Sequence, residues 1–208
     1  SKTSVFLEHH KLNKGVSSPA NMIWPWSPGG KPSLERLDAK YPGIKAAVIS
    51  AVDVIFGIAL TIGMEVIRVP GATGFIDTNY EGKAQAAINA IKKGFNFVYL
   101  HLEAVDECSH IGDLSLKMKA IEDFDSRIVG PVMKSLDNEN MTFAVLPDHP
   151  VPIKLRKHTR TPVPVSIYGS HIKPDSINVY SEQLAPTGGL GFLRGDQFMK
   201  RLLNLNPS

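Results

Sequence analysis

The stretch Phe95-Asn-Phe-Val-Tyr-Leu-His-Leu102 decides the fold, because it is a near-continuous apolar run. Such a run is typical of a strand buried on both faces in a sheet that helices cover. The polar segment Glu103-Ala-Val-Asp-Glu-Cys-Ser-His110 follows it directly. In open α/β sheets, functional sites form beyond the carboxyl ends of the strands. The stretch therefore predicts a sheet strand and also the place where a site should lie.

Short apolar runs alternate with amphipathic segments on both sides of this strand, which is typical of a βα array. Gly63 and Gly94 are expected to end two helices, and Gly130-Pro131 to break a third. Strands are expected over 22–26, 46–50, 65–69, 142–146 and 163–168, and helices over 33–40, 52–62, 79–93, 114–136 and 197–205. The prediction is an α/β fold with a mostly parallel sheet and helices on both faces.

The composition is that of an ordinary globular protein. Of 208 residues, 43% are hydrophobic and 21% are charged, which excludes a wholly disordered, collagen-like or fibrous chain. The formal net charge of +3 gives no sign of nucleic-acid binding, which needs basic side chains clustered on one face. The single cysteine, Cys108, excludes an internal disulfide and a thiolate-rich zinc site and favours a reducing compartment.

The sequence shows no targeting or membrane segment. The first ten residues include no initiator Met and no apolar run of signal-peptide length. The longest apolar stretch, Val52–Met64, contains Asp53 and is too short to cross a bilayer. We therefore expect a cytoplasmic protein with no membrane partner, whose sequence begins within a longer gene product.

Five polar side chains at predicted strand ends are candidate metal ligands. Asp106 and His110 are four residues apart, so on a helical turn they point the same way and one cation could bind both. Asp148 and His149 follow a later predicted strand, and His158 comes shortly after them. In an extended chain, the side chains of adjacent residues point to opposite sides. This pair therefore faces one site only where the strand has bent into a loop, or else it serves two ions on either side.

Three histidines and two aspartates without a thiolate favour Mn²⁺, Zn²⁺ or Mg²⁺ over a structural zinc site. Five ligands exceed what one catalytic zinc usually takes from protein. Two ions about 4 Å apart fit better, a geometry that recurs in phosphoryl transfer. The structural alternative is a turn whose Asp-His pair carries a capped or solvated imidazole.

Other polar and aromatic residues have structural interpretations. Trp24 and Trp26 alternate on a predicted strand, so both are expected to pack in a core. His101 lies within the apolar run and is expected to be a hydrogen-bonded core histidine rather than a ligand. Lys117 is expected on a solvated helix face or in a local ion pair, and Lys83 could line a substrate entrance.

At these positions the chain resembles the archaeal-type, cofactor-independent (2,3-bisphosphoglycerate-independent) phosphoglycerate mutases of the alkaline phosphatase superfamily. The matching motifs run in unbroken order from about Pro19 to the C-terminus, and they are specific when taken together. They are Pro19–Gly29, Ala47–Asp53, Val69–Gly74, Asp77–Lys83, His101–His110, Lys117, Ile121–Glu122, Asp125, Leu146–His149 and His158–Thr159. The resemblance implies an alkaline phosphatase-like core that is incomplete in this chain.

The resemblance also implies two divalent ions, usually manganese or zinc. Asp106, His110 and His158 would hold one ion, and Asp148 with His149 would hold the other. In such enzymes a serine that bridges both ions takes the phosphate from the substrate and returns it to the other hydroxyl. The 3- and 2-phosphoglycerates, small phosphorylated substrates, thus interconvert through a phosphoenzyme.

The parts that come first in the family have no counterpart here. The nucleophilic serine and an early metal-binding aspartate are missing, so no catalytic or substrate-binding residue is assigned. None of Ser109, Ser166, Ser170 and Ser181 lies in the nucleophile context. Residues 1–18 resemble the tail of an inserted second domain, and residues 19–208 the C-terminal part of the metal-binding, phosphatase-like domain. We expect the fragment to be inactive without the missing part of this glycolytic isomerase.

Two other reactions stay open for the same pair of ions. Family members with the variant Trp24-Pro-Trp-Ser-Pro-Gly29 have been proposed as homoserine kinases, and a phosphatase would hydrolyse the phosphoserine instead of transferring its phosphate. The identity of the metal and the oligomeric state do not follow from the sequence.

Overall fold

The computed structural model describes residues 2–25, 28–136 and 140–205. The chain divides into two compact units, Ser1–Leu34 and Glu35–Ser208. The first unit contains α1 (Lys2–His9) and the short 3₁₀ helix η1 (Lys11–Asn13). The Asn13 side-chain amide donates to the carbonyls of Leu7 and Ala20 and so holds the turn that follows α1.

The strand expected over 22–26 is not formed in its described part, residues 22–25. Pro25 has no N–H to donate to a strand ladder. Trp24 is 76% exposed, so its predicted place in a core was wrong. Trp26 lies outside the described residues.

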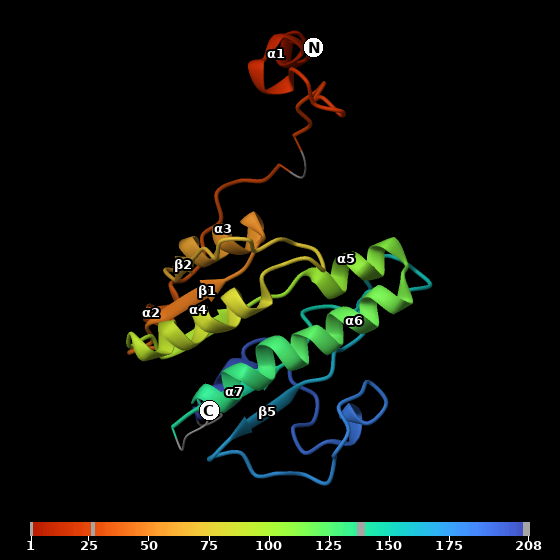
Figure 1. Ribbon diagram of the computed structural model, residues 1–208. Helices are drawn as coiled ribbons and strands as arrows, with labels where there is room; N and C mark the ends of the chain where they lie inside the picture. The colour runs from red at the N-terminus through yellow and green to blue at the C-terminus, as the bar shows by residue number, and fades with distance from the viewer. Residues whose placement is uncertain (1, 26–27, 137–139, 206–208) are drawn as a thin grey trace. The chain divides into compact units, whose positions relative to one another are not determined.

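The second unit is built on a three-stranded parallel sheet in the order β2-β1-β3, formed by β1 (Ala46–Ile49), β2 (Glu65–Ile67) and β3 (Phe97–Leu100). The two connections contain α3 (Asp53–Thr61) and α4 (Tyr80–Lys92). The first connection runs from β1 to β2 and the second runs back from β2, past β1, to β3. Because the two cross the sheet in opposite directions, right-handed crossovers place α3 and α4 on opposite faces, as Figure 1 shows. The predicted α/β architecture, with a parallel sheet and helices on both faces, is confirmed.

Alternating side chains of β1 form the two halves of the core. Val48 packs with Phe56 of α3 on one face, and Ala47 packs with Ala90 of α4 on the other. All four residues of β1 are buried, whereas β3 is an edge strand of this sheet and Tyr99 is 36% exposed. The expectation that the run over 95–102 is buried on both faces was therefore wrong. The fully buried strand is the central one.

The limits of α4 follow from local chemistry at its two ends. The Asn79 side chain caps the helix by accepting the Gly82 N–H at 2.8 Å. Gly94, with φ of +89°, turns the chain out of the helix in a conformation that favours glycine. The helix expected over 79–93 is thus confirmed to within a residue at each end.

The long helical segment expected over 114–136 forms as α6 (Leu114–Phe124), the π-helical turn η2 (Asp125–Val129) and α7 (Gly130–Leu136). Figure 1 shows it as one nearly continuous rod. The Gly130 N–H donates to the Asp125 carbonyl, five residues back. This widened turn accommodates Pro131, which has no N–H and would clash within a regular helix. The regular α-helix is thus interrupted next to Gly130-Pro131, as predicted, but by a π turn rather than by an end of the helical segment.

A second, two-stranded sheet pairs β4 (Thr142–Val145) with β5 (Ser166–Gly169) in antiparallel fashion. Phe143 lies opposite Tyr168, and their rings stack with centroids 6.2 Å apart. The segment between these two strands returns toward α5 (Ala104–Ile111). It contains three of the five candidate metal ligands.

The remaining helices are short. The helix expected over 33–40 is reduced to α2 (Leu37–Lys40), which begins after Arg36 rather than at Ser33. The 3₁₀ helix η3 (Ala185–Thr187) and α8 (Gln197–Leu202) lie near the C-terminus. No helix in the described part of the chain is long and apolar enough to cross a membrane.

Tyr180 fastens the C-terminal segment to the second sheet. Its hydroxyl donates to the Pro164 carbonyl at 2.9 Å and lies 3.4 Å from the Val145 carbonyl. We expect Tyr180→Phe to lower the free energy of unfolding at neutral pH by about 1 kcal/mol, the usual value of one hydrogen bond. Burial raises the pKa of Tyr180 to about 12.

The effect of Tyr180→Phe on the free energy of unfolding should depend on pH. Because the folded-state pKa is raised, the contribution of Tyr180 is fully present below the ordinary pKa of 10.0 and is lost as the pH rises through about 12. Urea unfolding of both proteins at pH 8 to 11.5 should therefore show the difference shrinking above pH 10. If the difference in free energy of unfolding stays constant or grows above pH 10, the Tyr180 hydroxyl does not stabilise the fold as a hydrogen-bond donor.

Candidate metal centre

The first two candidate ligands lie on α5, directly beyond β3. Their side chains share one face of the helix, with Asp106 Oδ2 3.4 Å from His110 Nε2. The predicted pairing four residues apart is therefore confirmed. Small side chains, Ala104 and Cys108, pack against Ala120 and let α5 lie close to α6.

The other three candidates lie on the loop that follows β4, which we call the ligand loop (residues 147–159). The Thr159 N–H donates to the Pro150 carbonyl at 3.0 Å and closes this loop on itself. Lys117 of α6 donates from Nζ to the Val151 carbonyl at 3.0 Å. Lys117 was expected on a solvated face or in an ion pair, and this was wrong, because it fastens the ligand loop to α6.

A second fastening orients the ring of His110. Its Nδ1 lies 2.9 Å from the Arg156 carbonyl oxygen. Because a carbonyl oxygen only accepts hydrogen bonds, Nδ1 donates its N–H in this contact, which leaves Nε2 facing Asp106 as a possible metal ligand. Metal-bound imidazoles are typically oriented in this way, through the nitrogen that does not bind the ion. Arg156 adopts a left-handed backbone conformation with φ of +50°.

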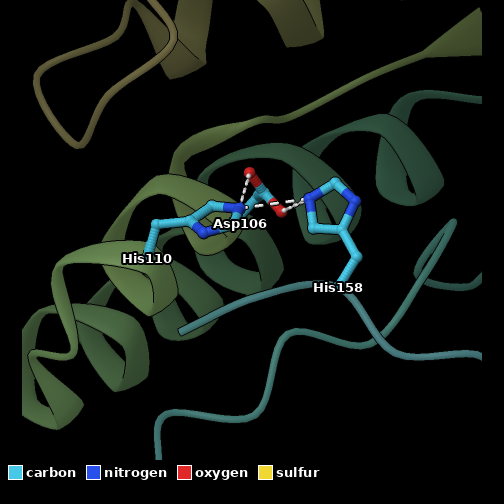
Figure 2. Close-up of side chains that lie close together, drawn as sticks. All are labelled: Asp106, His110 and His158. Carbon is cyan, nitrogen blue, oxygen red and sulfur yellow. Dashed lines mark hydrogen bonds and ion pairs between the residues drawn. The ribbon is translucent and has the colours of Figure 1, made fainter. Parts of the chain in front are cut away.

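Three donor atoms converge where the ligand loop meets α5, as Figure 2 shows. His158 Nε2 lies 3.1 Å from His110 Nε2 and 3.3 Å from Asp106 Oδ1. Two ligands at about 2.1 Å from one ion are about 3.0–3.4 Å apart at octahedral or tetrahedral angles. Facing imidazole lone pairs repel unless a cation or a proton lies between them. The three side chains therefore form a group that could hold a metal ion.

Asp148 and His149 lie against this group. The His149 ring stacks on His158 with centroids 3.8 Å apart, and its Nδ1 lies 3.8 Å from Asp106 Oδ1. Its Nε2 lies 3.5 Å from Asp148 Oδ2. The strand has ended before this pair, so both side chains turn to the same side. The structure thus brings all five candidate residues into one cluster.

Two buried atoms of the cluster lack hydrogen bonds among the described residues. They are Asp106 Oδ1 and His149 Nδ1. Leaving a buried polar atom unsatisfied costs about 1–3 kcal/mol. Both are atoms that bind divalent ions in proteins. The residues present therefore fit a metal centre, since divalent cations bind such atoms.

His101 lies beside the cluster and extends it. Its side chain is 14% exposed, and its Nε2 lies 3.7 Å from Asp148 Oδ2. The pKa of Asp148 is lowered, chiefly by hydrogen bonding from His101, against an opposing effect of burial and with help from the charge of His149. The expectation of a hydrogen-bonded histidine is met, but its contact with Asp148 was not foreseen. The sequence signal that could have placed His101 at the site was its position directly beyond β3, since sites form at the carboxyl ends of strands.

Lys83 lies behind the cluster and is fully buried. Its Nζ donates to the His101 carbonyl at 3.2 Å. Burial lowers the pKa of Lys83, and the nearby Glu103 carboxylate partly offsets this. The alternative that Lys83 lines a substrate entrance does not agree with this burial.

Comparison with known proteins identifies close relatives. The chain is 45% identical to the 2,3-bisphosphoglycerate-independent phosphoglycerate mutase of Methanosarcina acetivorans, over 98% of this chain and 52% of that protein. It is 46% identical to the enzyme of that name from Methanothrix thermoacetophila, over 95% of this chain and 51% of that protein. The chain thus spans about half the length of the curated relatives that it matches. The resemblance seen in the sequence motifs is confirmed.

Solved structures share the fold. A Pyrococcus horikoshii protein matches with a TM-score of 0.78 and 32% identity, over 82% of this chain and 51% of that one. The cofactor-independent phosphoglycerate mutase of Thermoplasma acidophilum matches in fold, with a TM-score of 0.59 and 22% identity, over 84% of this chain and 40% of that one. The family model of the metalloenzyme superfamily matches residues 7–205. With that match along nearly its whole length, the chain belongs to the metalloenzyme superfamily.

Proposed function

We propose that this chain supplies five protein ligands to the two-ion centre of a phosphoglycerate mutase. Asp106, His110 and His158 hold one ion, and Asp148 with His149 holds the other. The observation that carries the proposal is the convergence of the first three, whose donor atoms all lie within 4.8 Å of one another. Nitrogen and oxygen donors without sulfur suit Mn²⁺ or Zn²⁺, and Mg²⁺ is the third candidate.

When bound, the two ions would neutralise phosphate oxygens and activate a hydroxyl nucleophile. The residues of this chain hold and orient the ligands for that purpose. Lys117 and the Arg156 carbonyl fasten the ligand loop to α6 and α5, so the imidazoles keep their directions. Such preorganisation avoids a reorganisation cost during the reaction.

The reaction needs groups from outside this chain. A serine nucleophile and further ligands would come from the half of the relatives that the chain does not match, and the substrate would be a small phosphorylated acid. Residues 1–18 are assigned to the tail of an inserted domain and residues 19–208 to the metal-binding domain, and both assignments stay predictions.

A chimera tests the proposal. The matching half of the Methanosarcina acetivorans enzyme is replaced by this chain, and interconversion of 3- and 2-phosphoglycerate is measured. We expect turnover by the chimera and none by the 208-residue chain. Asp106→Asn in the chimera should reduce turnover by orders of magnitude, because all three neighbouring imidazoles point at this carboxylate.

The matched control is Asp125→Asn in the chimera, since Asp125 is exposed on the π turn. It should leave turnover unchanged. A folded, metal-loaded chimera that releases phosphate from phosphomonoesters, or phosphorylates homoserine with ATP, and does not isomerise phosphoglycerate would overturn the mutase assignment.

A further inference from the structure

Every hydrogen-bonding group of His101 except one ring nitrogen is held by the folded core. Its N–H donates to the Ile49 carbonyl at 2.8 Å, continuing the pairing of β3 with β1. Its carbonyl accepts from the buried Lys83 Nζ at 3.2 Å. Its Nδ1 lies 3.2 Å from the hydroxyl of Ser50, at the end of β1. With the backbone held at two points and the ring at one, Nε2 faces Asp148.

Ser50 is the hydrogen-bond partner of the ring on the side away from Asp148. Its oxygen accepts the Val52 N–H at 3.0 Å, so its own hydrogen is available to donate to His101 Nδ1. At the other end of the ring, the Asp148 carboxylate accepts hydrogen bonds and does not donate them. A donating Ser50 hydroxyl and an accepting Asp148 carboxylate both match a ring that carries its hydrogen on Nε2.

We propose that His101 is a positioning residue for the metal centre: Ser50 holds its ring and Lys83 its backbone carbonyl, so that Nε2 faces Asp148 Oδ2 at 3.7 Å and sets the orientation of that carboxylate. The inference rests on the proposed metal centre. Carboxylates that bind metals are typically hydrogen-bonded in turn, and such outer partners matter nearly as much as the ligands. Asp148 Oδ1 accepts the His149 N–H at 3.0 Å, so the backbone and His101 hold the carboxylate from two sides.

The order Ser50, His101, Asp148 has the chemistry of a hydrolase triad, but burial excludes that role. Ser50 is 2% exposed, and its oxygen is occupied by the Val52 N–H. A nucleophile must reach a substrate, and this hydroxyl faces the protein interior. We therefore assign Ser50 and His101 to the positioning of Asp148, and not to nucleophilic attack on a substrate. We call Ser50, His101 and Asp148 the relay.

The first test needs no substitution. Long-range ¹H–¹⁵N spectra of the ¹⁵N-labelled, metal-free chain at pH 7.5 distinguish the two neutral tautomers and the imidazolium of each histidine. We expect the hydrogen of the His101 ring on Nε2, and a mixture of tautomers in Ser50→Ala. An Nδ1–H tautomer, in which Nε2 carries no hydrogen, would overturn the proposal.

The second test follows binding of Zn²⁺ through the ¹⁵N shift of the His149 ring, a ligand of the second ion. His101→Asn is too short to reach Asp148 and should raise the half-saturating Zn²⁺ concentration about 10–100-fold, the usual effect of losing an outer partner. His101→Gln places an amide N–H near the position of Nε2 and should recover part of this loss. His171→Asn is the matched control, because His171 is exposed and lies beside Thr142.

The outcomes separate the two proposals. Equal Zn²⁺ affinity in His101→Asn and the unsubstituted chain would overturn the positioning role and leave the metal centre in place. If His149 does not respond to saturating Zn²⁺ in the unsubstituted chain, the second ion site of the proposed function fails. The tautomer of His101 then still decides whether the relay exists.

Discussion

Replacing Asp106 with asparagine is expected to weaken Zn²⁺ binding by more than ~100-fold, beyond the effect typical of outer partners. The carboxylate lies within 4 Å of nitrogens on His110, His149 and His158. Asparagine keeps the shape and removes the charge that a cation needs. Zn²⁺ should therefore raise the melting temperature of the unsubstituted chain, and a chelator should reverse this. Both effects should vanish in Asp106→Asn.

Competition with a chromophoric chelator measures the affinity, and calorimetry measures the melting temperatures. Asp125→Asn is the control for loss of one carboxylate charge, and it should bind Zn²⁺ like the unsubstituted chain. If Asp106→Asn keeps full affinity while its unfolding stays cooperative, the ion is bound elsewhere and the assignment of the five ligands fails.

Tyr80→Ala is expected to destabilise the chain by about 3–5 kcal/mol, the range for deleting a large buried aromatic ring. Tyr80 has no exposed surface and packs against Leu100 and Leu102, which lead from β3 toward the site, and against Ile128 of the π turn. The Arg127 guanidinium lies over its ring, 4.3 Å from the centroid. Urea unfolding measures the loss.

Tyr80→Phe is the matched variant. The hydroxyl of Tyr80 is buried without a hydrogen-bond partner among the described residues, so its removal should change stability by less than about 1 kcal/mol. A cost as large as that of the alanine variant would show that the hydroxyl, rather than the ring, stabilises this part of the core.

Local sequence signals predicted the elements whose limits depend on nearby residues. Asn79 and Gly94 bound α4 because a cap and a left-handed glycine act within a few positions of the chain. The π turn was not predictable in this way. Its wide hydrogen bond appears only when α7 continues past Pro131 to pack on α4. For Trp24 the local pattern was misleading. Apolar alternation predicted a strand packed in a core, but the pattern does not by itself form a strand, and Trp24 is exposed.

The site was predictable to the level of its ligands and no further. Asp106 and His110 follow from helical spacing, and the strand ends indicated where Asp148 and His149 would lie. The contacts that orient them join residues far apart in sequence, such as His110 with the Arg156 carbonyl and Lys117 with that of Val151. No local pattern encodes these pairs, because they form only when the ligand loop meets α5 and α6.

The left-handed backbone at Arg156 limits how this region can diverge during evolution. The carbonyl that orients His110 belongs to Arg156, where φ is +50°. Glycine and asparagine tolerate that conformation and would keep the carbonyl in place. Gly112 is also left-handed, and a Cβ there would overlap the Arg156 guanidinium. Position 156 can therefore drift among a few residue types, whereas a side chain at position 112 would strain the left-handed backbone and displace the exposed Arg156 guanidinium.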